Sequence, residues 1–146
     1  SSRLRNSGEN MRLIAASSGG LDDWKTAICG QLYAMPAARA RAFHLPIGLP
    51  VEDGFLRAMV LTDVFTRPED MSRIDGLAGL HHLYASERSL PALIRHQTRI
   101  VIGSAINFAA FQTLLAVPTG ARREELARAA AQEGWLATVI RSRLPR

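Results

Sequence analysis

Two adjacent carboxylates, Glu52 and Asp53, are the first candidates for acid–base chemistry in this sequence. They follow Pro50 and open a segment whose apolar side chains recur with a helical period. Acidic residues in the first turn face the positive end of the helix dipole, so a simple helix start explains the pair. A carboxylate held at a helix start after a rigid loop can also deprotonate an attacking hydroxyl. From the residues alone, both interpretations stay open.

A second candidate is the basic stretch RHQTR at 95–99, which falls in a predicted helix. Arg95 and Arg99 are four residues apart and therefore share a helix face. Two such guanidinium groups repel each other unless an anion lies between them, and a pyrophosphate could accept forked hydrogen bonds from both. The alternative is a solvated basic face, or pairing with Glu87 and other acids.

Other catalytic chemistry finds little support in the sequence. His81 and His82 lack the spacing of metal ligands and have no evident third partner, so a structural role is favoured. Cys29 lies in an apolar stretch, which disfavours a nucleophile, and a single cysteine cannot form an intrachain disulfide. The sequence contains no dinucleotide-binding glycine motif, no phosphate loop and no nucleophile elbow.

The composition is that of one globular domain with a basic surface. The chain has 146 residues, of which 47% are hydrophobic and 21% charged, and its net charge is +5. Lys25 is the only lysine, so the positive charge is carried by arginine. An arginine excess suggests partners that carry phosphate, such as nucleotides, nucleic acid or anionic lipid, or else a compositional bias of the source genome.

Periodicity and helix breakers predict helices with two short strands. Apolar runs predict buried strands at Ala27–Met35 and Leu80–Ala85. Helices are expected at Ala37–Phe43, from Glu52 to about Phe65, from Ser89 through Arg99, at Arg122–Gln132 and from Trp135 onward. One further turn is expected within Pro68–Ile74.

Two segments near the C-terminus could contact a membrane. Ile100–Val117 has no charged residue and reaches the length of a transmembrane candidate, but its polar residues Ser104 and Asn107 weaken insertion. A buried or membrane-interface helix is therefore favoured. The segment that begins at Trp135 combines apolar residues with arginines, which fits either an interfacial anchor or a helix packed on its own domain.

The order of these pieces is more specific than any one of them. The pieces are Cys29-Gly30, Val51-Glu52-Asp53, the pattern His-x-x-Tyr-x-Ser-Glu-Arg at 81–88, and the basic stretch at 95–99 followed by Gly103. In this order the chain resembles the C-terminal, acceptor-binding half of a family 2 glycosyltransferase. It is most similar to the membrane-associated kind related to cellulose and hyaluronan synthases, and the likeness runs from about Cys29 to Asn107.

The resemblance assigns roles to the acidic pair. It implies that Asp53 is the catalytic base and that Glu52 supports it from an adjacent position. The implied activity is the inverting transfer of a sugar from a nucleotide-sugar donor to an acceptor hydroxyl. A dipole-stabilised carboxylate stays ionised, so a helix start and a base at Asp53 are compatible.

The basic stretch matches the family only in part. The family has a Gln-x-x-Arg-Trp motif on a helix near the acceptor and the donor diphosphate, but the third residue after Gln97 is Ile100. His96-x-x-Arg99 keeps the spacing, with His in place of Gln and Ile100 in place of Trp. Arg99 is therefore the firmest substrate-binding candidate, with His96, Gln97 and Arg95 beside it. These departures argue against a processive polymer-synthase activity.

The resemblance also implies parts that this sequence lacks. The family uses Mg²⁺ or Mn²⁺ at an Asp-x-Asp site in its nucleotide-binding half, and Asp22-Asp23 lies in the wrong context for such a site. Because the chain starts at Ser1 without Met, we expect a fragment that is inactive in isolation. The expected division is 1–27 as a lead-in or remnant of the missing half, 28–107 as the acceptor-binding half, and 108–146 as a helical, membrane-interface segment.

The expected fold class is α/β but mostly helical, the C-terminal part of a Rossmann-like transferase domain followed by amphipathic helices. Partners would be a nucleotide sugar, its acceptor, a membrane surface on the cytoplasmic side and, through an exposed sheet edge, a second copy. The alternative function is a non-enzymatic, arginine-rich helical module that binds anionic membrane or nucleic acid. Scattered arginines and few aromatic residues make nucleic acid the weaker of these two partners.

Overall fold

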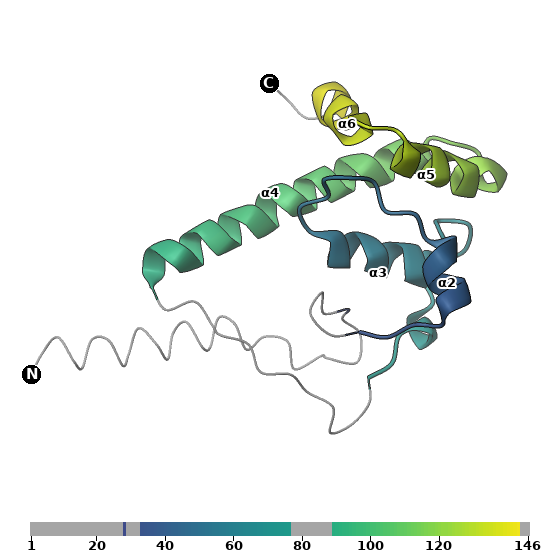
Figure 1. Ribbon diagram of the computed structural model, residues 1–146, viewed down its shortest axis with the longest axis horizontal. Coiled ribbons are helices and arrows are strands. Elements are labelled where there is room, and N and C mark those ends of the chain that lie inside the picture. Colours follow the sequence, from purple (N-terminus) through teal and green to yellow (C-terminus); the bar gives the residue numbers. More distant parts are fainter. Residues whose placement is uncertain (1–27, 29–32, 77–88, 144–146) are drawn as a thin grey trace, which may run out of the picture.

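A computed structural model describes residues 28, 33–76 and 89–143, and all regular elements in these residues are helices (Figure 1). The α-helices are α2 (Ala37–Ala42), α3 (Glu52–Thr62), α4 (Leu90–Leu115), α5 (Arg122–Ala131) and α6 (Trp135–Arg143). Two short 3₁₀ turns, η1 (Met71–Arg73) and η2 (Thr119–Ala121), complete the order. The long helix α4 forms the spine, with α3 packed along it and α5 and α6 gathered at its C-terminal end (Figure 1).

The prediction of a mostly helical chain is confirmed, whereas the Rossmann-like sheet finds no support. The described residues contain no strand. At the described end of the first expected strand, Tyr33–Met35 is not paired in a sheet, and the Tyr33 side chain is 49% exposed. A buried strand requires partners on its edges or faces, which this segment does not have among the described residues. The second expected strand, Leu80–Ala85, lies outside the described residues.

The expected helices agree closely with the observed ones, although α3 ends earlier than predicted. Ser89 begins α4 by accepting a hydrogen bond from the Ala92 backbone N–H at 3.3 Å. Gly134 separates α5 from α6 in the left-handed conformation, with φ of 75°. Helix α3 ends at Thr62. The next residue, Asp63, also has a left-handed backbone, and this conformation cannot continue a right-handed helix.

The core lies where α3, α5 and α6 meet the C-terminal half of α4. Its buried residues are Phe55, Met59, Val64, Ala109, Ala110, Leu114, Leu126, Ala129, Trp135, Leu136 and Val139. Phe111 of α4 contacts both the first turn of α3 and the turn that follows this helix, since its ring lies 5.3 Å from the rings of Phe55 and Phe65. Each large apolar side chain buried here contributes about 1.5–3 kcal/mol. The burial of Trp135 and Leu136 shows that α6 packs on its own domain.

Helix α4 is also apolar on the side away from this core. Its exposed apolar residues are Leu90, Ile94, Val101, Ile102, Phe108 and Leu115. By length and composition this is the one helix of the described residues that could cross a membrane, and 28% of its most apolar window is buried. Soluble core helices pass the same test, so this property alone does not place α4 in a membrane.

Candidate functional site

The start of α3 docks closely against the middle of α4. The Asn107 side-chain amide donates a hydrogen bond to the Val51 carbonyl at 2.7 Å. Gly103 makes room for this contact, because a Cβ added there would lie 2.2 Å from Val51 Cγ2. The start of α3, which carries the acidic pair, is therefore held at a fixed position against α4, although Val51 provides no side-chain cap for α3.

Glu52 and Asp53 occupy the first turn of α3, as the sequence predicted. Glu52 is exposed and Asp53 is half-buried. Asp53 Oδ1 accepts a hydrogen bond from the Gly54 backbone N–H at 2.7 Å, which orients the carboxylate at the helix start. In the part of the chain that the structure describes, no other group donates a hydrogen bond to this carboxylate.

Three of the four substrate-binding candidates lie together on α4. Arg95, His96 and Arg99 line one open depression with Ala92, whereas Gln97 is exposed and does not line it. Arg99 lies one helical turn before Gly103, the residue that contacts Val51. Arg99 and the acidic pair thus lie within about one helical turn of the same α3–α4 contact, and Arg95 lies one turn further along α4.

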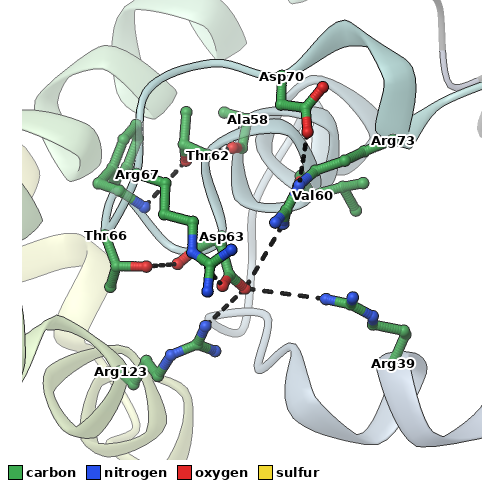
Figure 2. A network of polar contacts seen from close by, with 11 residues as sticks. Arg39, Ala58, Val60, Thr62, Asp63, Thr66, Arg67, Asp70, Arg73 and Arg123 are labelled. Carbon is green, nitrogen blue, oxygen red and sulfur yellow. Dashed lines mark hydrogen bonds and ion pairs between the residues drawn. The ribbon is translucent and has the colours of Figure 1, made fainter.

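A second charged centre, not predicted from the sequence, surrounds Asp63 at the C-terminal end of α3. Arg39 from α2, Arg73 from η1 and Arg123 from α5 point towards its carboxylate in Figure 2, and Arg67 approaches it from the following turn. Arg123 makes the closest contact, with 2.5 Å between Nη2 and Oδ1. The other three guanidinium groups lie 3.6–4.0 Å from the carboxylate.

The arginines decide the charge state of Asp63. The side chain is only 10% exposed, and this burial by itself would raise the pKa of the carboxyl. The hydrogen bond from Arg123 and the positive charges of Arg123, Arg73 and Arg67 act in the opposite direction and are together stronger. The pKa of Asp63 is therefore lowered from its ordinary value, and the carboxylate is ionised at neutral pH.

A turn of left-handed residues holds Asp63 in place. Asp63, Val64 and Phe65 have φ values of 53°, 62° and 55°, a conformation that costs about 1–3 kcal/mol for a residue with a side chain. Thr62 Oγ1 accepts a hydrogen bond from the Phe65 N–H at 2.9 Å, and Thr66 Oγ1 donates to the Asp63 carbonyl at 2.7 Å. Arg122 Nη1 donates to the Phe65 carbonyl, so α5 also fixes the turn.

A signal for this centre exists in the sequence but is weak. Asp63 is the only charged residue in the apolar stretch MVLTDVF at 59–65, and a buried carboxylate needs a positive partner. Nothing in the sequence shows which of the many arginines fold back to it. His81, His82 and Cys29 lie outside the described residues.

No metal site is formed by the described residues, which contain no group of three or more His, Cys, Asp or Glu side chains suited to an ion. Comparisons with family models, with curated proteins and with solved structures find no match to this chain.

Proposed function

We propose that this chain supplies the acceptor side of an inverting glycosyltransferase site that uses a nucleotide-sugar donor. The observation that carries the proposal is the junction of α3 and α4. It places a carboxylate pair at one helix start beside a helix that bears two arginines on one face. Base and anion-binding groups on two rigid, packed helices are what a displacement of a diphosphate by a hydroxyl requires. The partial resemblance to family 2 glycosyltransferases points to the same reaction.

In the proposed reaction, Asp53 accepts the proton of the acceptor hydroxyl while its oxygen attacks the anomeric carbon of the donor sugar. The bond from that carbon to the diphosphate breaks, and the diphosphate leaves with the electron pair. Attack opposite the leaving group inverts the anomeric configuration. Arg99 and Arg95 stabilise the negative charge on the leaving diphosphate with forked hydrogen bonds.

The Mg²⁺ or Mn²⁺ implied by the resemblance does not fit the residues described here. The acidic pair stands without the further oxygen or nitrogen ligands that such an ion requires. The nucleotide-binding half, and with it the metal ligands, would have to come from elsewhere, and no step above passes through a metal.

The test compares two proteins with a panel of nucleotide sugars and acceptors. Residues 1–146 alone should give no transfer, because the resemblance covers only the acceptor-binding half of such an enzyme. The product of the complete reading frame should release nucleoside diphosphate and form a glycoside of inverted configuration, detected by NMR of the anomeric proton. Transfer by residues 1–146 alone, or a retained configuration, would refute the proposal in this form.

A membrane-binding module is the second candidate, and the exposed apolar face of α4 favours it. Ile94, Val101, Phe108 and Leu115 recur at every seventh position and are all exposed. A helix with such a face can lie in a membrane interface, where the net charge of +5 favours anionic lipid. This property is compatible with a membrane-associated transferase, and it would be the whole function if no transfer occurs.

A further inference from the structure

The centre around Asp63 holds more positive charge than its own acids neutralise. Four arginines, Arg39, Arg67, Arg73 and Arg123, lie within 4.0 Å of a single carboxylate. The only other acid paired with them among the described residues is Asp70, which contacts Arg73 at 3.5 Å. Four positive charges therefore face two negative ones, which leaves an excess of two.

One of the four arginines has further partners besides Asp63, and the other three, called the open arginines below, are about half exposed and pair with Asp63 alone among the described residues. Arg73 is 18% exposed and is engaged by Asp70 and by the Val60 carbonyl, to which its Nη1 donates at 3.3 Å. Arg39, Arg67 and Arg123 are 58%, 66% and 47% exposed. In the described part of the chain, their only ion-pair partner is Asp63. Each guanidinium has five N–H donors, far more than the two oxygens of Asp63 can accept.

The open arginines are also positioned in advance. They come from α2, from the turn after α3 and from α5, and Figure 2 shows Arg39, Arg67 and Arg123 reaching Asp63 from these separate elements. The left-handed turn fixes Asp63, and so Asp63 gathers the guanidinium groups that would otherwise repel each other. Because the three guanidinium groups are already close together, little free energy is lost in ordering them when a ligand binds.

We propose that Arg39, Arg67 and Arg123 form a binding site for a phosphate group on the solvent side of Asp63. A phosphate carries up to two negative charges, which matches the excess, and its oxygens accept the forked hydrogen bonds that arginine donates. The site lies ten residues along α3 from Asp53, about 15 Å for a helix rise of 1.5 Å per residue. It is therefore separate from the transferase site and does not depend on that proposal.

The test measures phosphate binding to residues 1–146 and to arginine variants at constant ionic strength. Sodium phosphate and pyrophosphate should shift backbone amide resonances in NMR to saturation, whereas sodium chloride should not. Replacing both Arg39 and Arg67 by Gln should weaken binding at least about tenfold, because both charges and forks are lost. These two make only long contacts with Asp63, so their replacement leaves its closest pair, with Arg123, intact.

Arg128→Gln is the matched control, since Arg128 is exposed on α5 but pairs with Glu125 and Gln132. Its phosphate affinity should stay within about twofold of the parent. Far-UV circular dichroism checks that the double variant is folded, and the single variant Arg67→Gln replaces it if it is not. A phosphate effect no larger than that of chloride, or an equal loss in Arg128→Gln, would overturn the proposal.

A second arm distinguishes a lipid headgroup from a soluble phosphate. Phosphatidylcholine vesicles are prepared with and without phosphatidic acid. If the site takes a headgroup, the acidic vesicles should bind the parent better than the double variant, and pyrophosphate should compete. If the site takes a soluble phosphate, the parent should bind pyrophosphate, and the parent and the double variant should bind the acidic vesicles equally.

Discussion

Asp63 lies at the buried C-terminal end of α3 and forms ion pairs with arginines that are exposed at the surface. Its carboxylate is largely shielded from water, yet Arg123, Arg73 and Arg67 lower its pKa and keep it ionised. Removing one partner of a buried ion pair leaves the others uncompensated, which is usually more costly than the pair is stabilising. Replacing Asp63 should therefore change both the free energy of unfolding and its dependence on pH.

We expect Asp63→Asn to lower the free energy of unfolding by about 2 kcal/mol at neutral pH, less than for a fully buried pair because three of the arginines are about half exposed. Asn tolerates the left-handed backbone, so the change isolates the charge. Urea denaturation measures the difference. An unchanged midpoint would show that the arginines do not stabilise the fold through Asp63.

The same variant should change the acid limb of the stability curve. Because the pKa of Asp63 is lower folded than unfolded, the unfolded chain binds more protons and stability falls as pH falls. The contribution is complete above the ordinary value of 3.8 and is lost as the pH drops through the folded pKa. The difference between parent and Asp63→Asn should therefore shrink below about pH 4. A difference independent of pH would contradict this.

Thr62 tests whether side-chain hydrogen bonds hold the left-handed turn. Thr62→Val removes the acceptor of the Phe65 N–H and should cost about 1–2 kcal/mol of unfolding free energy. Thr113→Val is the matched control, because the Thr113 hydroxyl only donates to the Ala109 carbonyl within α4. Equal losses in thermal denaturation of both variants would show that the turn needs no such support.

At the scale of elements, the contact of α3 with α4 depends on a missing side chain. Gly103→Ala brings a methyl group within 2.2 Å of Val51 Cγ2 and 3.2 Å of Pro50 Cγ, so the segment that leads into α3 must shift away from α4. We expect a loss of about 1–3 kcal/mol despite the better helix propensity of Ala.

Gly54→Ala, on the other helix of the same contact, is the control. Its Cβ would meet Asn107 Nδ2 and Val51 Cγ1 at 3.6 Å, which is ordinary contact. This variant should be stabilised by about 0.5–1 kcal/mol. Chemical denaturation measures the free energy of unfolding of both variants. Stabilisation by Gly103→Ala would mean that α3 and α4 do not pack this closely.

The sequence predicts elements well where a local signal exists. Ser89 and Pro91 mark the start of α4, the acidic pair marks the start of α3, and Gly134 marks the break before α6. The left-handed Asp63–Phe65 turn has no glycine to announce it. Its conformation is imposed by packing and by Arg122 from a distant helix.

Of the two candidate sites, one has a local signal in the sequence and the other depends on the tertiary fold. The four-residue spacing of Arg95 and Arg99 predicts a shared face, and both line one depression. The arginines around Asp63 come from 39, 67, 73 and 123, and only the tertiary fold brings them together. Contacts between distant positions leave no periodic pattern, so the sequence could mark Asp63 as unusual but could not show which arginines surround it.

At the scale of the whole molecule, one side of α4 is covered by the core while the opposite side is apolar and exposed. Replacing both Val101 and Phe108, which are 68% and 62% exposed, by Gln should lower binding to anionic vesicles at least about tenfold. Ile47→Gln is the control, since Ile47 is 69% exposed but lies outside α4. Vesicle co-sedimentation measures both proteins, and equal binding by parent and double variant would show that α4 does not enter the interface.

We propose that Asp53 removes a proton from an acceptor hydroxyl. The most direct measurement is the rate of sugar transfer by the complete reading frame carrying Asp53→Asn, with Glu52→Gln as the neighbouring control. Loss of the base should lower kcat by about 10²–10⁴ while donor binding persists, and Glu52→Gln should have a much smaller effect. Transfer by Asp53→Asn at a rate close to that of the parent would contradict the claim and return the pair to the role of a helix start.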